Sequence, residues 1–138
     1  MDLRTHVTGI EFANPLLLAS GILNETGASM ARAAREGAGG VVTKSMGPQP
    51  RHGHANPTVV EVEGGLLNAM GLPGPGVEHF AVEVQEALAA GAVVVGSVFG
   101  ASSEEYAEVA VKMAGTGVAA LELNVSCPHA KGYGTELG

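Results

Sequence analysis

Four short apolar runs recur along the chain, and each ends in small or polar residues. They are LLLAS (16–20), GGVVTKS (39–45), AVVVGSVFG (92–100) and VAALELNV (118–125). Continuous apolar runs of this length are typical of strands that are buried on both faces, as in a parallel sheet. The pattern therefore predicts four buried strands with polar residues at their carboxyl ends.

Segments with the period of an amphipathic helix lie between these runs. They are TGASMARAAREG (26–37), PGVEHFAVEVQEALAAG (75–91) and the stretch that follows Ser102. In the second segment, Phe80, Val84 and Leu88 share one apolar face. Ser102 and Glu105 form the S-x-x-E signature of a capping box at the start of the third. Strands that alternate with helices predict right-handed βαβ units and a parallel sheet.

The number of strands decides between an open sheet and a barrel. An open doubly wound sheet can be built from a few strands, whereas a (β/α)8 barrel needs eight strands and typically about 250 residues. The sequence stops at Gly138, after the fourth apolar run and without a fourth helix. We therefore predict an α/β fold in which residues 1–138 are the N-terminal half of a single (β/α)8 TIM-barrel domain, with about four βα units.

A long excursion, residues 46–74, separates the second predicted strand from its helix. Within it, TVVEVEGGLLNAMG predicts a β-hairpin whose turn is supplied by Glu63, Gly64 and Gly65. Loops of this length in a compact domain are usually functional.

Composition and charge narrow the class of partner. The chain has 46% hydrophobic residues and a formal net charge of −7, so it can form a core but lacks the basic surface that nucleic acids or anionic membranes attract. It contains no apolar run of about 20 residues that could span a bilayer, and its N-terminus does not resemble a signal peptide. We therefore expect a cytoplasmic protein that binds neither nucleic acid nor membrane.

Polar residues collect where the predicted strands end. They are Ser20 and Gly21, Lys44 and Ser45, Ser97, and then Asn124, Ser126 and Cys127. In a barrel the carboxyl ends of the strands share one face, and active sites are built on that face. A lysine or an amide at such a position is costly unless it bonds something, and a ligand over the barrel mouth would provide the partner.

Cys127 is the only cysteine, in the segment ELNVSCPHAKGYG (122–134). It cannot form an intramolecular disulfide, so it is a buried apolar residue, a ligand or a reactive thiol. A thiol has a reference pKa of about 8.5 and can supply a useful thiolate fraction when its surroundings favour charge. The spacings His52-x-His54 and Cys127-x-His129 are not standard for zinc, so no metal site is expected.

The motifs NPLLLASG, VVTKS, LLNAMGLPGPGVE and ELNVSCPHAKGYG together resemble the first half of a class 1 dihydroorotate dehydrogenase, with features of the NAD-linked 1B type. The resemblance implies a (β/α)8 barrel with FMN across its top and an N-terminal hairpin at its bottom. It also implies oxidation of (S)-dihydroorotate to orotate in de novo pyrimidine biosynthesis. The partners implied by this resemblance are the small-molecule substrate, a second copy in a homodimer, and an FAD and iron–sulfur subunit that passes electrons to NAD.

The resemblance also assigns roles to residues at matching positions. Cys127 matches the catalytic base. The positions implied to contact the flavin are Ala19, Ser20, Gly21, Lys44, Ser45, Ser97 and Asn124. The positions implied to bind the substrate are Lys44, Asn68, Met70, Gly71, Leu72, Asn124 and His129.

Two departures from the family pattern leave alternatives open. His129 stands where many members have asparagine after Cys-Pro, and this spelling also resembles the flavin domain of dihydropyrimidine dehydrogenase, which acts on uracil. Ser97 stands where an asparagine is expected on the third strand. A further alternative is a non-catalytic half-barrel fragment, because the phosphate site of such barrels is usually built after strands seven and eight.

Overall fold

The computed structural model describes residues 1–126 and Tyr133. Its centre is a parallel sheet of four strands in the order β3-β4-β7-β8, which is also their order along the chain. The strands are β3 (Leu17–Leu18), β4 (Gly40–Val42), β7 (Val94–Val98) and β8 (Ala120–Leu123). Each falls within one of the four apolar runs, so the predicted parallel α/β sheet is confirmed.

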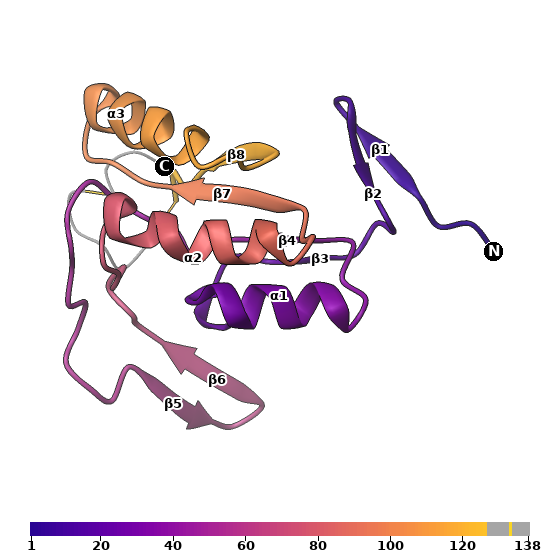
Figure 1. Ribbon diagram of the computed structural model, residues 1–138. Helices are drawn as coiled ribbons and strands as arrows, with labels where there is room; N and C mark the ends of the chain where they lie inside the picture. The colour runs from indigo at the N-terminus through magenta and orange to yellow at the C-terminus, as the bar shows by residue number, and fades with distance from the viewer. Residues whose placement is uncertain (127–132, 134–138) are drawn as a thin grey trace.

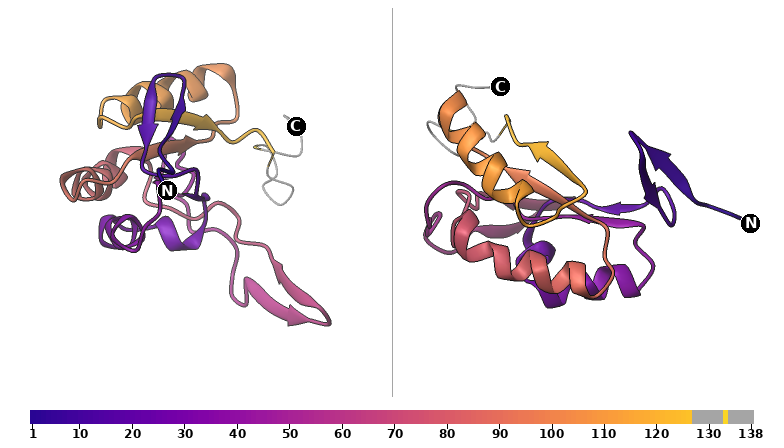
Figure 2. Two further views of the ribbon diagram at one scale, coloured as in Figure 1. Left: turned by 90° about the vertical axis from the view of Figure 1, so that its right-hand side faces the viewer. Right: turned by 45° about the horizontal axis from the view of Figure 1, so that its top comes forward.

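Three helices follow the first three strands of this sheet. They are α1 (Gly27–Arg35), α2 (Val77–Ala89) and α3 (Ser103–Ala114), and a short 3-10 turn, η1 (Ile22–Asn24), precedes α1. The described residues therefore contain three strand–helix units and a fourth strand, where the sequence predicted about four units. Figure 2 (left) shows α1 and α2 together on one side of the sheet.

Local hydrogen bonds explain where two of the helices begin. Thr26 caps α1 with a complete capping box, in which it and Ser29 bond each other's backbone N–H groups. At α3, Ser102 Oγ accepts from the Glu105 N–H as predicted. The Glu105 carboxylate instead accepts from the N–H of Ala101, one residue earlier than a capping box requires.

The hydrophobic core lies between the helices and the sheet. Its fully buried members include Met30, Val41, Phe80, Val84, Val94 and Met113. The close approach of α3 to β7 depends on Gly96, because a Cβ there would lie 2.4 Å from Met113 Cγ. The predicted helix faces are therefore the ones that pack on the sheet.

Burial on both faces, predicted for all four strands, is wrong for β3, where Leu17 is 45% exposed, and for β8. Leu121 and Leu123 are 37% and 56% exposed. Leu121 pairs with Gly96, whose missing side chain points to α3, so these leucines face the helix layer. α3 packs beside β8, and in the described part of the chain β8 has a strand neighbour on one side only. Both leucines are therefore uncovered where a helix after β8 would lie.

Two antiparallel hairpins project from this body (Figure 1). The N-terminal one pairs β1 (Thr5–Val7) with β2 (Ile10–Phe12), and the hairpin implied by the family resemblance is present. The second pairs β5 (Val59–Val62) with β6 (Gly65–Asn68) around the turn Glu63–Gly64, inside the predicted excursion. Figure 2 (left) shows this second hairpin extending away from α1 and α2.

No helix in the described part of the chain is long and apolar enough to cross a bilayer.

Candidate active site

The carboxyl ends of all four parallel strands are joined by a chain of side-chain hydrogen bonds. Ser45, after β4, lies at its centre. Its Oγ is 3.4 Å from Ser20 Oγ, 2.8 Å from Ser97 Oγ and 3.0 Å from Asn124 Nδ2. Ser97 Oγ in turn donates to Glu122 Oε1 at 2.9 Å. The sequence placed these serines and the asparagine at strand ends, and the fold brings them into contact.

The centre of this hydrogen-bond chain is shielded from water. Ser45 is 6% exposed and Ser97 is fully buried. The backbone N–H of Ser97 donates to Thr43 Oγ1 at 2.9 Å, which ties β7 to the residue that follows β4. Hydrogen bonds between buried polar groups cost stability when one partner is lost, so this cluster is a fixed part of the fold.

Lys44 is the one buried lysine among the described residues, with 8% of its surface exposed. Its Nζ lies 3.4 Å from Glu25 Oε1, and the Glu25 side chain is 47% exposed. A surface carboxylate compensates a buried ammonium only weakly. The charge of Lys44 is thus held in place and available to an anionic ligand.

Asn24, which the sequence analysis did not single out, fixes the position of the Lys44 backbone. It is fully buried, and its side chain donates to the carbonyl oxygens of Ala19 and Val42. The backbone carbonyl oxygen of Asn24 accepts a hydrogen bond from the Lys44 N–H at 3.2 Å. Asn24 therefore holds the ends of β3 and β4 together. Asn24 follows the apolar residues Ile22 and Leu23, and this single polar residue was the sequence signal that could have identified it.

A cavity of about 370 Å³ opens beside Lys44. Its lining residues are Ser20, Gly21, Ile22, Lys44, Val59, Leu66, Asn68 and Met70. Five of these, Ser20, Gly21, Lys44, Asn68 and Met70, were predicted to bind flavin or substrate, although they come from three separate segments of the chain. The hairpin supplies Val59, Leu66 and Asn68, which alternation puts on one face of β5 and β6. Lys44 also lines a second cavity, of about 270 Å³, with Glu25 and Pro73.

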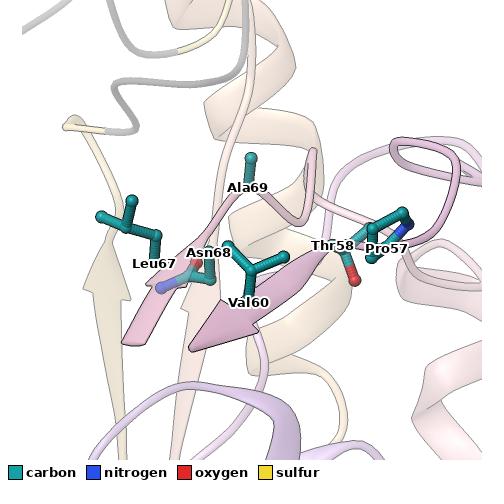
Figure 3. A pocket seen from close by; sticks show the side chains of 6 residues that line it. All are labelled: Pro57, Thr58, Val60, Leu67, Asn68 and Ala69. Atoms are coloured by element: carbon teal, nitrogen blue, oxygen red, sulfur yellow. The ribbon is translucent and has the colours of Figure 1, made fainter. Parts of the chain in front are cut away.

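The opposite face of the hairpin forms a separate pocket, shown in Figure 3. Its lining residues are Pro57, Thr58, Val60, Leu67, Asn68 and Ala69. Asn68 lines both this pocket and the cavity beside Lys44. The other predicted site residues are absent from this lining, which is mostly apolar.

The other predicted substrate-loop residues lie just beyond β6. Gly71 is buried with φ at 77°, and a Cβ there would lie 2.7 Å from the ring of His54. Leu72 has φ at 53°, a left-handed conformation that is unfavourable for a leucine. Neither residue lines the cavity beside Lys44. Ala19 is exposed and contributes its carbonyl to Asn24.

Tyr133 was also missed by the sequence analysis. Its ring meets the edge of Phe99 with centroids 5.4 Å apart, and the Arg51 guanidinium lies 4.6 Å from its centroid. At the other end of the same segment, Tyr106 Oη donates to the Asn124 carbonyl at 2.5 Å. Cys127 and His129, which come between Asn124 and Tyr133 in the sequence, lie outside the described residues.

Metal-binding clusters are not found in this part of the molecule. Among residues 1–126 and Tyr133, no group of three or more His, Cys, Asp or Glu side chains is arranged to hold a metal ion.

A parallel sheet with helices on one side and polar residues at the carboxyl ends of its strands is the arrangement on which barrel enzymes build their sites. The chain belongs to the dihydroorotate dehydrogenase family, whose sequence model matches residues 2–138.

Curated relatives and a solved structure extend this finding. The chain is 53% identical over 140 residues to a protein of Methanocaldococcus jannaschii and 54% identical over 136 residues to one of Pyrococcus abyssi. Each is named dihydroorotate dehydrogenase B (NAD(+)), catalytic subunit. Both matches cover 99% of this chain but 45% of the relative, so the chain spans about half the length of these proteins.

The fold is also similar to that of a solved dihydroorotate dehydrogenase. The crystal structure of the Eimeria tenella enzyme in complex with ferulenol matches with a TM-score of 0.81 at 20% identity. The match covers 95% of this chain and 38% of the other. It supports an α/β fold with the parallel sheet of a TIM-barrel fragment.

Proposed function

We propose that this chain is the N-terminal half of a (β/α)8 enzyme that oxidises (S)-dihydroorotate to orotate in pyrimidine biosynthesis, with FMN as hydride acceptor. The observation that carries the proposal is the single cavity that gathers Ser20, Gly21, Lys44, Asn68 and Met70, in a chain that belongs to this family. The uncovered leucines of β8 support a continuation of the barrel. The proposal treats residues 1–138 as part of one domain.

The described residues fit a flavin at the strand ends. No other heavy atom lies within 4 Å of where a Cβ on Gly21 would be, so a flat ring can approach the backbone there. Lys44 brings a buried positive charge to the same cavity. FMN supplies a hydride acceptor when bound. The phosphate group would be held after later strands of the barrel, by analogy with other barrels.

The substrate would be held by charge and amide groups. Lys44 is suited to the substrate carboxylate, and the amides of Asn68 and Asn124 can donate to ring carbonyls or accept from ring N–H groups. We assign substrate contacts to Met70, Gly71, Leu72 and His129 as well. Ala19, Ser45 and Ser97 would support the flavin side of the site.

Cys127 is proposed as the general base. Its thiolate would take a proton from one ring carbon of dihydroorotate while a hydride leaves the neighbouring carbon for the flavin, which creates the double bond of orotate. The charge of Lys44 would stabilise the anionic substrate and the electron-rich reduced cofactor.

The electron acceptor is proposed from the names of the relatives. Because they are catalytic subunits of an NAD(+)-type enzyme, we propose that a second subunit, carrying FAD and an iron–sulfur cluster, receives electrons from FMN and passes them to NAD. A homodimer of the catalytic subunit is proposed as well.

The test is an assay of the full-length protein, reconstituted with FMN under anaerobic conditions. We expect dihydroorotate to bleach the flavin and to yield orotate faster than dihydrouracil yields uracil. Faster oxidation of dihydrouracil would favour the dihydropyrimidine dehydrogenase-like alternative. Residues 1–138 alone should fail to hold FMN at micromolar protein. A stoichiometric FMN complex of this piece that survives gel filtration would show that the remaining barrel is not needed for binding.

A further inference from the structure

Glu122 lies at the end of the hydrogen-bond chain, and although it is the first residue of the motif ELNVSCPHAKGYG, the sequence analysis gave it no role. It occupies the middle of β8, directly opposite Ser97 in the register of β7 and β8. Residues that are paired in register share one face of a sheet, so Glu122 points to the side that carries the site. Its Oε1 accepts a hydrogen bond from Ser97 Oγ at 2.9 Å.

An ionised carboxylate can only accept hydrogen bonds, and this fixes the direction of every bond behind it. Ser97 must use its single hydroxyl hydrogen on Glu122. Ser97 Oγ must then accept from Ser45, since the two oxygens are 2.8 Å apart. With its hydrogen committed to Ser97, Ser45 Oγ has two lone pairs left.

Those two lone pairs determine what Ser20 and Asn124 can do. Asn124 has to present its Nδ2 to Ser45, at 3.0 Å, because its Oδ1 would meet a lone pair. The Asn124 Oδ1 correspondingly accepts from the Ser126 N–H at 3.4 Å. The contact between Ser20 Oγ and Ser45 Oγ is long, at 3.4 Å, and Ser20 can only be its donor, in which case Ser20 offers only lone pairs to the cavity that it lines.

We propose that Glu122 is a positioning residue that makes Ser20 a hydrogen-bond acceptor toward the cavity ligand, through Ser97 and Ser45. The ligand group that fits is a ring N–H or a hydroxyl that can donate. The proposal deepens the function proposed above, on which it rests for the identity of the ligand as FMN. A reversed chain, in which Ser45 donates to Ser20, would turn the Ser20 hydrogen toward the cavity and disfavour the same ligand.

The test compares FMN affinity of the full-length protein with Glu, Gln and Lys at position 122. Glutamine can accept or donate at Ser97 and permits both chain directions, so Glu122→Gln should weaken FMN binding about twofold to threefold. Lysine can only donate and imposes the reversed chain, so Glu122→Lys should weaken it about tenfold or more, the size of one lost hydrogen bond. Electrostatics alone predicts the opposite order, since a positive charge favours the anionic phosphate of FMN.

A double-mutant cycle isolates the route through Ser97. In a Ser97→Ala background the hydroxyl that links Glu122 to Ser45 is gone, so Glu122→Gln should have no further effect on FMN affinity. The same substitution in a Ser20→Ala background should also have none. Glu108→Gln and Glu108→Lys, on the outer helix α3, serve as matched charge controls and should leave FMN affinity unchanged.

Two results would overturn the proposal: equal or tighter FMN binding in Glu122→Lys, or effects of Glu122→Gln and Ser97→Ala that add independently. If Glu122→Lys does not fold, the cycle with Glu122→Gln decides alone. The outcome is separable from the proposed function. A protein that binds FMN but prefers dihydrouracil would refute the dihydroorotate assignment. The order of FMN affinities among the position 122 variants would still test the role of Glu122.

Discussion

Asn124 and Ser45 are in hydrogen-bond contact, with Nδ2 3.0 Å from Oγ, although they follow strands that are not neighbours in the sheet. β7 lies between β4 and β8, and Ser97 on that strand is also hydrogen-bonded to Ser45. A single hydroxyl thus bonds groups from three other strands, which makes Ser45 the point at which a small change should have the widest effect.

Ser45→Ala should destabilise the protein and loosen the site. Three polar partners lose their shared oxygen, and Ser97 is fully buried, so we expect a loss of about 1–3 kcal/mol in the free energy of unfolding. Urea denaturation of the full-length protein, with and without FMN, measures this. Ser103→Ala, at an exposed helix start, is the control. An unfolding midpoint equal to wild type would show that the contacts contribute nothing net.

Cys127→Ser should retain FMN but lose catalysis. If the thiol is the base, serine should slow flavin reduction by dihydroorotate by about 10² to 10⁴, the usual contribution of general-base catalysis. The residual rate should also require more alkaline conditions, since a hydroxyl has a much higher pKa than a thiol. Stopped-flow measurement of flavin bleaching across pH tests both. Wild-type rates at neutral pH would assign Cys127 a structural role only.

Lys44→Met should weaken the binding of orotate by about tenfold to a hundredfold, because it removes a buried charge from the proposed carboxylate site. Methionine preserves the length of the side chain, so the cavity should keep its shape. Equilibrium titration of the full-length FMN protein with orotate and with uracil, which lacks the carboxylate, gives the comparison. A matched control is Lys112→Met on α3, where the lysine bonds Glu78 and Glu108. An equal loss for both ligands would place Lys44 away from the carboxylate.

Glu78 should titrate below its usual range because of Lys112. The hydrogen bond from Lys112 Nζ, 2.6 Å away, lowers the pKa of the Glu78 carboxyl from its ordinary value of 4.5. A lowered folded-state pKa means that the contribution to stability is present above the unfolded-state value and is lost as pH falls through the folded-state value. The contribution is small at this exposed position. NMR titration of Glu78 should show the lowered pKa, and Lys112→Met should return it toward 4.5.

The sequence predicted where strands and site residues lie along the chain better than it predicted which side chains contact each other between strands. The apolar runs located all four strands, and their polar ends located Ser20, Lys44 and Asn124, because a strand must end where side chains meet water or a ligand. Glu122 was missed since it reads as an ordinary charge between Leu121 and Leu123. Its importance comes from the register with Ser97, which no local pattern encodes. Roles of individual site residues stay predictions until tested.

The burial of β8 was mispredicted for a related reason. An apolar run indicates what a strand needs as cover, but the cover is supplied by other parts of the fold. Leu121 and Leu123 are partly exposed beside α3, at a strand that has a neighbour on one side only in the described part of the chain. The same limit applies to Tyr133, whose contact with Arg51 joins residues far apart in sequence.

The hydrogen-bond chain through Ser20, Ser45, Ser97 and Glu122 forms only when the strands pair in the correct register. Side chains alternate along a strand, so a slip of one residue at β7 would turn Ser97 toward the helices and break the chain. A ligand that binds only when the hydrogen-bond chain is complete would stabilise correctly aligned molecules over misaligned ones by mass action. Such a ligand, present while the protein folds, would therefore raise the share of molecules whose strands are correctly aligned.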